Sequence, residues 1–130
     1  MSIARSIVLA ITLSLIGAGA VAAPTPFEAK LAIARTNASS KSGAEFDRKL
    51  GTALVTKQAQ AQMSQCLKDN PGPHSVRGYF EFTTATRFRL IVQPDDRFSR
   101  CLVRTTEGHA APKPPRLPYL NPFSFSSTPK

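Results

Sequence analysis

The hydrophobic positions near the start of the chain predict an amphipathic helix. Its start is marked by Thr25-Pro26-Phe27-Glu28, in which Thr25 is placed to accept a backbone amide and Glu28 to reach back to the amide of Thr25. Pro26 stands where a helix needs no backbone N–H. One face of this helix carries Phe27, Leu31 and Ala34. The small, polar residues 37–43 then predict a loop.

A second, longer helix is predicted from Ser42-Gly43-Ala44-Glu45, which repeats the capping pattern, to Lys68. Its first apolar stripe comprises Phe46, Leu50, Ala53 and Leu54. A second stripe, rotated from the first, comprises Val55, Ala59, Met63 and Cys66. Gly51 weakens the middle of this helix by roughly 1 kcal/mol relative to alanine. Residues 69–73, Asp-Asn-Pro-Gly-Pro, end it.

From Ser75 the hydrophobic period changes from helical spacing to two. Two alternating runs, 75–83 and 87–93, are separated by a short turn at 84–86 and therefore predict an antiparallel hairpin. The core face carries Val76, Gly78, Phe80, Phe82, Phe88, Leu90 and Val92. The opposite face, predicted to be exposed to solvent, carries Arg77, Tyr79, Glu81, Thr83, Arg87, Arg89, Ile91 and Gln93.

A third helix is predicted after Pro94-Asp95-Asp96, because an acidic residue caps a helix N-terminus well. Its inner face carries Phe98, Cys101, Leu102 and Thr105. The proline-rich residues 112–118 predict an extended connection. Phe123 and Phe125 alternate with serines in a final short strand, and Pro122 restricts that strand to a sheet edge or stands at its first residue.

These elements predict an α+β fold, in which two N-terminal helices precede a strand-strand-helix-strand unit with a small antiparallel sheet. Residues 23–130 are expected to form one domain, with a helical segment over 23–74 and the strand-strand-helix-strand unit over 75–130.

Residues 1–22 have the layout of a secretory signal peptide. Arg5 precedes an apolar run over 7–16, and Ala20-Val21-Ala22 predicts cleavage after Ala22. The alternative is an uncleaved membrane anchor, but the apolar run is shorter than the roughly 20 residues that a spanning helix needs. We therefore expect a periplasmic or secreted protein that keeps no membrane span.

Cys66 and Cys101 are the two cysteines of the chain, and in an oxidising compartment they predict one disulfide bond. They show neither the spacing of a redox C-x-x-C motif nor a zinc-ligand pattern. Closing a loop of this length adds roughly 3 to 4.7 kcal/mol to the stability of a small domain.

The chain carries a net charge of +9, and loss of the signal peptide lowers it by one because Arg5 is removed. Such a charge favours acidic partners, although it also serves solubility alone. Two groups of arginines form the candidate surface for an anionic ligand: Arg77, Arg87 and Arg89 on the hairpin, and Arg97, Arg100 and Arg104 on the third helix. Tyr79 lies among the strand arginines and could stack on a nucleobase.

Residues for catalysis are sparse, so the sequence predicts a non-enzymatic protein without a cofactor or metal. His74 and His109 each stand in a loop-like setting beside proline or glycine, and no serine stands in a nucleophile elbow. The adjacent pair Asp95-Asp96 is better explained by helix capping than by acid/base chemistry.

Residues 76–127 resemble the C-terminal unit of TonB-type energy transducers and, more closely, small exported bacterial proteins that carry a similar unit behind a helical segment. The resemblance rests on the phenylalanine-rich hairpin, on Phe98-Ser99-Arg100-Cys101-Leu102, on residues 112–118 and on Phe123-Ser124-Phe125. It implies a fold and a location in the cell envelope. The long linker of those transducers has no counterpart before the unit, so energy transduction is not implied.

The function expected from the sequence is an exported binding or structural domain of the bacterial cell envelope. Its partner is an envelope protein or a polyanionic polymer, bound through the basic face or an open sheet edge. Nucleic acid is a further, less favoured partner. The alternative is a secreted effector or inhibitor that acts on a foreign enzyme or cell.

Overall fold

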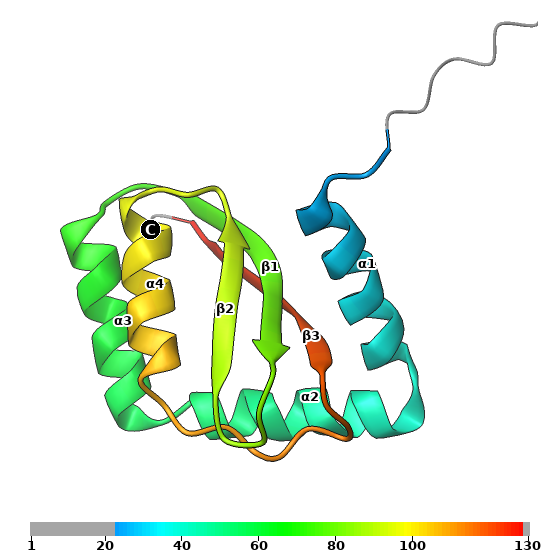
Figure 1. Ribbon diagram of the computed structural model, residues 1–130. Helices are drawn as coiled ribbons and strands as arrows, with labels where there is room; N and C mark the ends of the chain where they lie inside the picture. The colour runs from blue at the N-terminus through cyan, green and yellow to red at the C-terminus, as the bar shows by residue number, and fades with distance from the viewer. Residues whose placement is uncertain (1–22, 129–130) are drawn as a thin grey trace, which may run out of the picture.

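The computed structural model describes residues 23–128, so the predicted signal peptide and its cleavage site lie outside the described residues. The fold is α+β, as the sequence predicts, but three helices rather than two precede the strand-strand-helix-strand unit (Figure 1). The elements are α1 (Pro26–Ser39), α2 (Lys41–Leu54), α3 (Lys57–Asp69), β1 (His74–Phe82), β2 (Phe88–Gln93), α4 (Arg97–Glu107) and β3 (Tyr119–Ser127).

The predicted loop over 37–43 is wrong, because α1 continues to Ser39 and α2 begins at Lys41. Ser40 alone makes the corner. It ends α1, and its Oγ accepts the amide of Gly43 at 3.0 Å, so Ser40 rather than Ser42 caps α2. Gly43 is needed here because a Cβ at this position would lie 1.8 Å from the carbonyl oxygen of Asn37.

The predicted single helix over 42–68 is also wrong, because the chain breaks into α2 and α3 at Val55 and Thr56. Thr56 has extended backbone angles, and its Oγ1 accepts the amide of Ala59 at 3.0 Å, which starts a new helix. The break explains why the two apolar stripes of the sequence are rotated relative to each other. The first stripe belongs to α2 and the second to α3.

The three strands form one antiparallel sheet in the order β2-β1-β3. β1 is therefore central, and β3 pairs with it over its whole length, from Phe82 opposite Tyr119 to His74 opposite Ser127. β3 is much longer than the short strand predicted around Phe123 and Phe125. Pro122 lies inside β3, and β3 is an edge strand, which confirms the prediction that proline restricts this strand to an edge.

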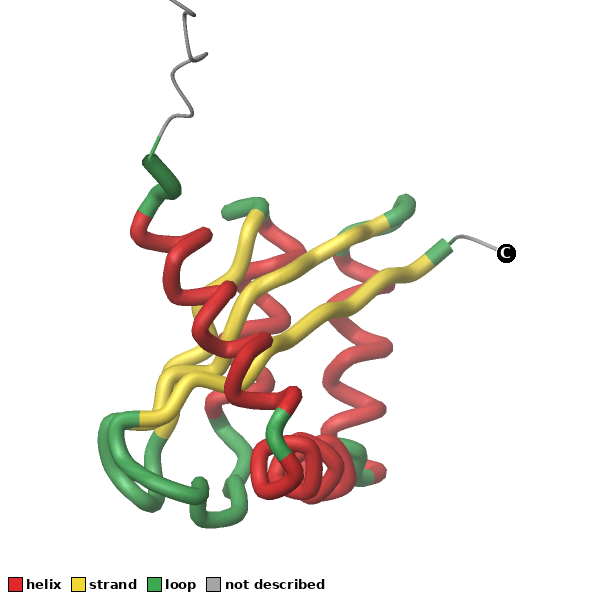
Figure 2. The backbone as a smooth tube through the Cα atoms, turned by 90° about the vertical axis from the view of Figure 1, so that its right-hand side faces the viewer, coloured by secondary structure: helices red, strands yellow, loops and turns green. Residues whose placement is uncertain are grey.

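Both faces of the sheet are covered (Figure 2). One face packs on α2 and on the α3–α4 pair through two clusters of buried side chains: Phe46, Leu50, Phe80, Phe82, Phe88, Leu90 and Tyr119 in the first, and Cys66, Val76, Phe98 and Leu102 in the second. The opposite face packs on α1 through a third cluster of Leu31, Ala34 and Tyr79.

The prediction that the second face of the hairpin is exposed to solvent is confirmed for Arg77, Arg87 and Arg89, but it is wrong for Tyr79. Tyr79 is buried under α1, and its ring lies 5.6 Å from that of Phe27. Alternation along β1 correctly separates the two faces, but it does not reveal that an N-terminal helix packs on the more polar face. Tyr79 consequently cannot serve as a stacking platform for a base.

The predicted disulfide is confirmed. Cys66 in α3 and Cys101 in α4 are bonded, with their Cα atoms 5.8 Å apart. The bond links the antiparallel pair α3 and α4, which lie side by side against the sheet (Figure 1). Within residues 23–128, none of the helices has the length and apolar character required to cross a membrane.

Candidate functional site

Within residues 23–128, the outer edge of β3 has no neighbouring strand. The Nδ2 of Asn37 donates to the carbonyl oxygen of Leu120 at 2.9 Å, so the backbone groups of Leu120 point away from β1. In an antiparallel ladder this orientation repeats at every second residue, which places the backbone groups of Pro122, Ser124 and Ser126 on the same outer edge. Pro122 has no N–H to offer, which is consistent with this parity.

The remaining open part of the edge lies at Ser124 and Ser126. The carbonyl oxygen of Leu120 accepts the hydrogen bond from Asn37, and the carbonyl oxygen of Pro122 accepts one from Nδ2 of Asn121 at 3.2 Å. Among the described residues, no side chain hydrogen-bonds to the backbone of Ser124 or Ser126. The edge therefore offers unpaired amides and carbonyls to a further extended chain.

A groove of about 920 Å³ follows this edge. Five consecutive residues of β3, from Asn121 to Phe125, line it. Because successive residues of a strand point to opposite faces, such a lining means that the groove wraps around the edge and does not lie over one face. Its walls are α1 on one side of the sheet and α2, α3 and α4 on the other.

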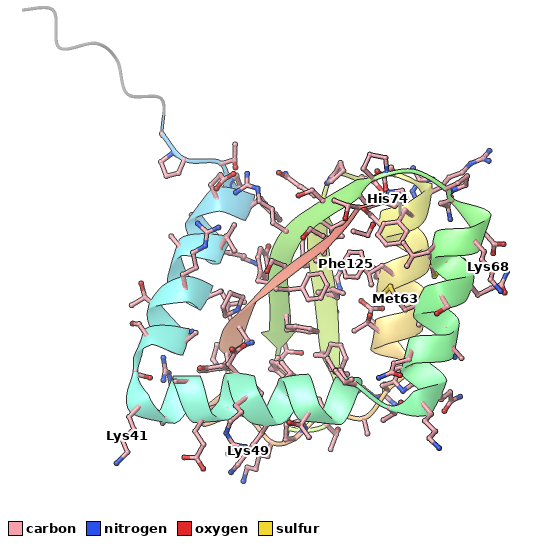
Figure 3. All side chains as sticks on the ribbon, turned by 180° about the vertical axis from the view of Figure 1, so that it is seen from behind. Lys41, Lys49, Met63, Lys68, His74 and Phe125 are labelled. Carbon is pink, nitrogen blue, oxygen red and sulfur yellow. A yellow bond between two sulfur atoms is a disulfide. The ribbon has the colours of Figure 1, made fainter. Side chains whose placement is uncertain are left out.

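The apolar part of the groove lies between β3 and α3. Phe123 and Phe125 are half-buried on β3, and Met63 of α3 is half-buried opposite them. Figure 3 shows Met63 and Phe125 in the space between their two elements. Val55, at the break between α2 and α3, is 63% exposed and also lines the groove. This region leaves apolar surface available to the side chains of a ligand.

The polar part of the groove lies towards α1 and α2, where Arg35, Asp47 and Asn121 line it. Asn121 is fully buried, and its Nδ2 donates to Oδ1 of Asp47 at 2.8 Å. The Oδ1 of Asn121 has no hydrogen-bond partner among the described residues. Buried carbonyl oxygens are normally paired, so this wall of the groove keeps an unused acceptor.

The two histidines have structural contacts. The Nε2 of His74 lies 2.6 Å from the carbonyl oxygen of Asn70, and its ring stacks on Phe98 with the centroids 4.0 Å apart. His109 lines the groove, and its Nε2 lies 2.8 Å from Oε1 of Gln62 in α3. Each ring thus connects neighbouring elements, and the two rings belong to different parts of the fold.

Asp95 and Asp96 have separate roles at the start of α4. Oδ1 of Asp96 accepts the amide of Ser99 at 2.8 Å, and this hydrogen bond lowers the pKa of the Asp96 carboxyl below its ordinary value. Asp95 accepts a hydrogen bond from Nε of Arg100 at 2.9 Å. Helix capping, which the sequence predicts for the pair Asp95-Asp96, is therefore carried out by Asp96, whereas Asp95 forms an ion pair. Among residues 23–128, no group of three or more histidine, cysteine or acidic side chains is placed to hold a metal ion.

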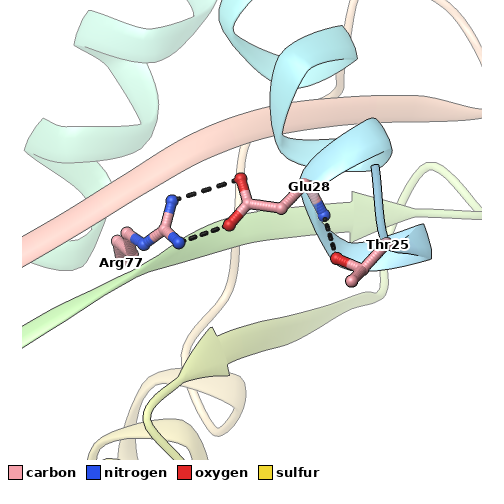
Figure 4. Close-up of polar contacts among 3 residues, drawn as sticks. All are labelled: Thr25, Glu28 and Arg77. Atoms are coloured by element: carbon pink, nitrogen blue, oxygen red, sulfur yellow. Dashed lines mark hydrogen bonds and ion pairs between the residues drawn. The ribbon is translucent and has the colours of Figure 1, made fainter. Parts of the chain in front are cut away.

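The hairpin arginines are partly neutralised by acidic groups. Arg77 forms a two-pronged ion pair with Glu28 of α1, in which Nη1 donates to Oε2 at 3.3 Å and Nη2 to Oε1 (Figure 4). This bonding lowers the pKa of the Glu28 carboxyl. Glu28 therefore does not reach back to Thr25 as predicted, although Thr25 caps α1 by accepting the Glu28 amide at 3.2 Å.

Arg89 lies opposite Glu81 in the β1–β2 register, and Glu81 also accepts a hydrogen bond from Nζ of Lys30 at 2.8 Å. That bond raises the pKa of the Lys30 ammonium group. Arg87 lies at the hairpin turn, where its backbone amide donates to Oγ1 of Thr84. Arg77 and Arg89 thus belong to the α1 side of the sheet.

The α4 arginines form a separate group. Arg97, Arg100 and Arg104 line one hollow beside α3. The six predicted arginines are therefore divided between two regions and do not form one patch. Their role in binding an anion stays a prediction.

Sequence reasoning missed the groove because its lining comes from six elements that are distributed along the chain. The signal for its edge was present, since Pro122 and the serines that alternate with Phe123 and Phe125 are typical of an exposed edge strand. The opposing Met63 could not be placed without the break at Thr56. No family model, curated protein or solved structure matches this chain.

Proposed function

We propose that this protein is an exported, non-enzymatic binding domain of the bacterial cell envelope that takes an extended segment of a partner protein along the outer edge of β3. One observation carries the proposal. The groove follows the edge as far as Phe125 and so includes Ser124, and among the described residues the outward amides and carbonyls of Ser124 and Ser126 have no neighbouring strand. An added strand satisfies such groups and gains main-chain hydrogen bonds.

The side chains around the edge support a particular kind of segment. Alternate residues of an added strand point to opposite faces, so every second side chain of the segment would meet the apolar surface of Phe125 and Met63. The intervening side chains would face α1, where Arg35 and Arg77 line the groove and Arg77 is already paired with Glu28, so Arg35 supplies the charge for an acidic group. With the net positive charge of the chain, this arrangement favours a segment that combines apolar and acidic residues.

Export is the second part of the proposal and rests on the layout of residues 1–22 together with the disulfide. Intact-mass measurement of protein recovered outside the cytosol is expected to give a chain that begins at Ala23. Recovery of the full-length chain in the inner membrane would contradict export.

A library of unstructured decapeptides displayed on phage tests the binding function directly. Peptides selected on the oxidised protein are synthesised and titrated into ¹⁵N-labelled protein. We expect saturable shifts at the amides of Ser124 and Ser126 and at Met63, with little change along the outer face of α4. Shifts confined to α4, or the absence of any selected sequence, would contradict the proposal.

A further inference from the structure

A second concave site lies on the other side of α3 from the groove, between the end of α3 and the outer face of α4. It is a hollow of about 370 Å³ lined by Asp69, Asn70, Arg97, Arg100, Cys101 and Arg104. The three arginines occupy positions i, i+3 and i+7 of one helix, which fall on one face. Arg97 and Arg104 are roughly 10 Å apart along the axis, so their long side chains can converge on Arg100.

The positive charge of this hollow is incompletely compensated. Among the described residues, Arg100 is paired with Asp95 through Nε, and its side chain remains 65% exposed. Arg97 and Arg104 form no ion pair within the part of the chain that the structure describes. Asp69, the carboxylate in the lining, accepts a hydrogen bond from Nε2 of Gln65 at 2.9 Å.

The geometry of the donors indicates which anion fits. Guanidinium groups present planar sets of N–H donors that match the oxygens of carboxylates and phosphates. Three guanidinium groups around one hollow offer more donors than the two oxygens of a carboxylate accept. A phosphate monoester has three terminal oxygens and a charge of about −1.5 to −2 at neutral pH. The concave shape between two helices admits a small protruding group more readily than a flat surface.

We propose that the hollow between α3 and α4 is a phosphate-binding site, in which Arg97, Arg100 and Arg104 hold the phosphate group of a ligand. This site is independent of the β3 groove, because the two linings share no residue. The protein would then bind a peptide segment at one site and a phosphate group at another. The phosphate could belong to a soluble ester or to a lipid headgroup, and the experiment separates the two sources.

The test uses oxidised ¹⁵N-labelled protein at low ionic strength, titrated with inorganic phosphate, glycerol 3-phosphate, acetate and, in a separate arm, vesicles that contain phosphatidic acid, whose headgroup is a phosphate monoester. Arg97→Gln/Arg104→Gln removes the two unpaired arginines, and both single variants are measured as well. Arg48→Gln/Arg87→Gln is the matched control, because it removes the same charge from exposed positions outside the hollow. Melting curves establish that each variant is folded.

We expect the amides at the start of α4 to shift saturably with phosphate and glycerol 3-phosphate in wild type and in the control. The Arg97→Gln/Arg104→Gln variant should lose about tenfold or more in affinity. Vesicle binding that the same variant loses would assign the phosphate to a lipid headgroup, and its absence would assign it to a soluble ester. Either result supports the phosphate site.

Three results would overturn the proposal. Equal affinity for acetate would remove the selection for phosphate. An equal loss in the control variant would show that net charge alone attracts the anion. A lower melting temperature of Arg97→Gln/Arg104→Gln without saturable phosphate binding to wild type would show that these arginines only stabilise the C-terminus of α3.

Discussion

Reduction of the Cys66–Cys101 disulfide should strongly destabilise the protein without changing its fold. The bond joins α3 to α4, and its two cysteines are separated by 35 positions in the sequence. Both helices also pack on the sheet through Phe98, Leu102 and Cys66, which are buried. The native contacts can therefore persist after reduction, whereas the unfolded chain gains freedom.

The magnitude follows from the length of the closed loop. For the 35-position separation, the chain-entropy relation gives a loss of about 3.8 kcal/mol in the free energy of unfolding at 25 °C. One kcal/mol shifts the melting temperature of a domain of this size by roughly 4–8 °C, so the expected fall is about 15–30 °C. Stabilities of small domains are about 5–15 kcal/mol, so a large share of the total depends on this bond.

Urea denaturation of oxidised and fully reduced wild-type protein measures the effect without a substitution. Alkylation and mass spectrometry confirm that the oxidised sample has no free thiol and the reduced sample has two. Using the same chain in both states avoids the cavity that Cys66→Ala would create at a buried site. An unchanged midpoint and slope after verified reduction would refute the reasoning. Two alkylatable cysteines in protein recovered outside the cytosol would refute the role of the bond in the native molecule.

Two further predictions concern the helices. Leu31→Ala should lower the free energy of unfolding by about 2–5 kcal/mol, because Leu31 is 1% exposed between α1 and the sheet. The control Ile33→Ala, at a residue of the same helix that is 52% exposed, should change it by less than about 0.5 kcal/mol. Equal effects of the two substitutions in thermal melts would contradict the packing of α1 on the sheet. Asp96→Ala should cost about 1 kcal/mol at pH 7. Since the Asp96 pKa is lowered in the folded state, this difference should be present above the ordinary value near 3.8 and disappear as the pH falls through the folded-state pKa; a difference that persists at lower pH would contradict the charged cap.

Local patterns predicted the elements of this fold better than their boundaries. The strands β1 and β2, the helix α4 and the disulfide follow from alternation, the acidic cap and the pairing of two cysteines. The predicted boundaries of α1, α2 and α3 are wrong because several serine and threonine residues in this region can each cap a helix. The capping-box pattern favours Ser42, with Glu45 three residues on, but the close packing of Gly43 against the carbonyl of Asn37 places the helix start at Ser40. Thr56 likewise divides a stretch that looks continuous in composition.

The candidate site depended on long-range packing and was therefore less predictable. Nothing in the periodicity of β1 indicates that Arg77 meets Glu28 of α1, which is 49 positions away. The position of β3 at a sheet edge was predictable from Pro122, but the groove beside it requires α1, α2 and α3 to stand around that edge. The sequence of this small domain thus reveals its elements, whereas the groove beside β3 is visible only in three dimensions.

The affinity of one selected peptide for two variants at Ser124 tests the central claim most directly. Ser124→Pro removes an outward-pointing amide without removing a bond to β1, as Pro122 already does two residues earlier, whereas Ser124→Ala keeps that amide. By calorimetry we expect Ser124→Pro to weaken binding about tenfold or more and Ser124→Ala to leave it within about twofold of wild type. Unchanged affinity of a folded Ser124→Pro variant would contradict strand addition at the edge of β3.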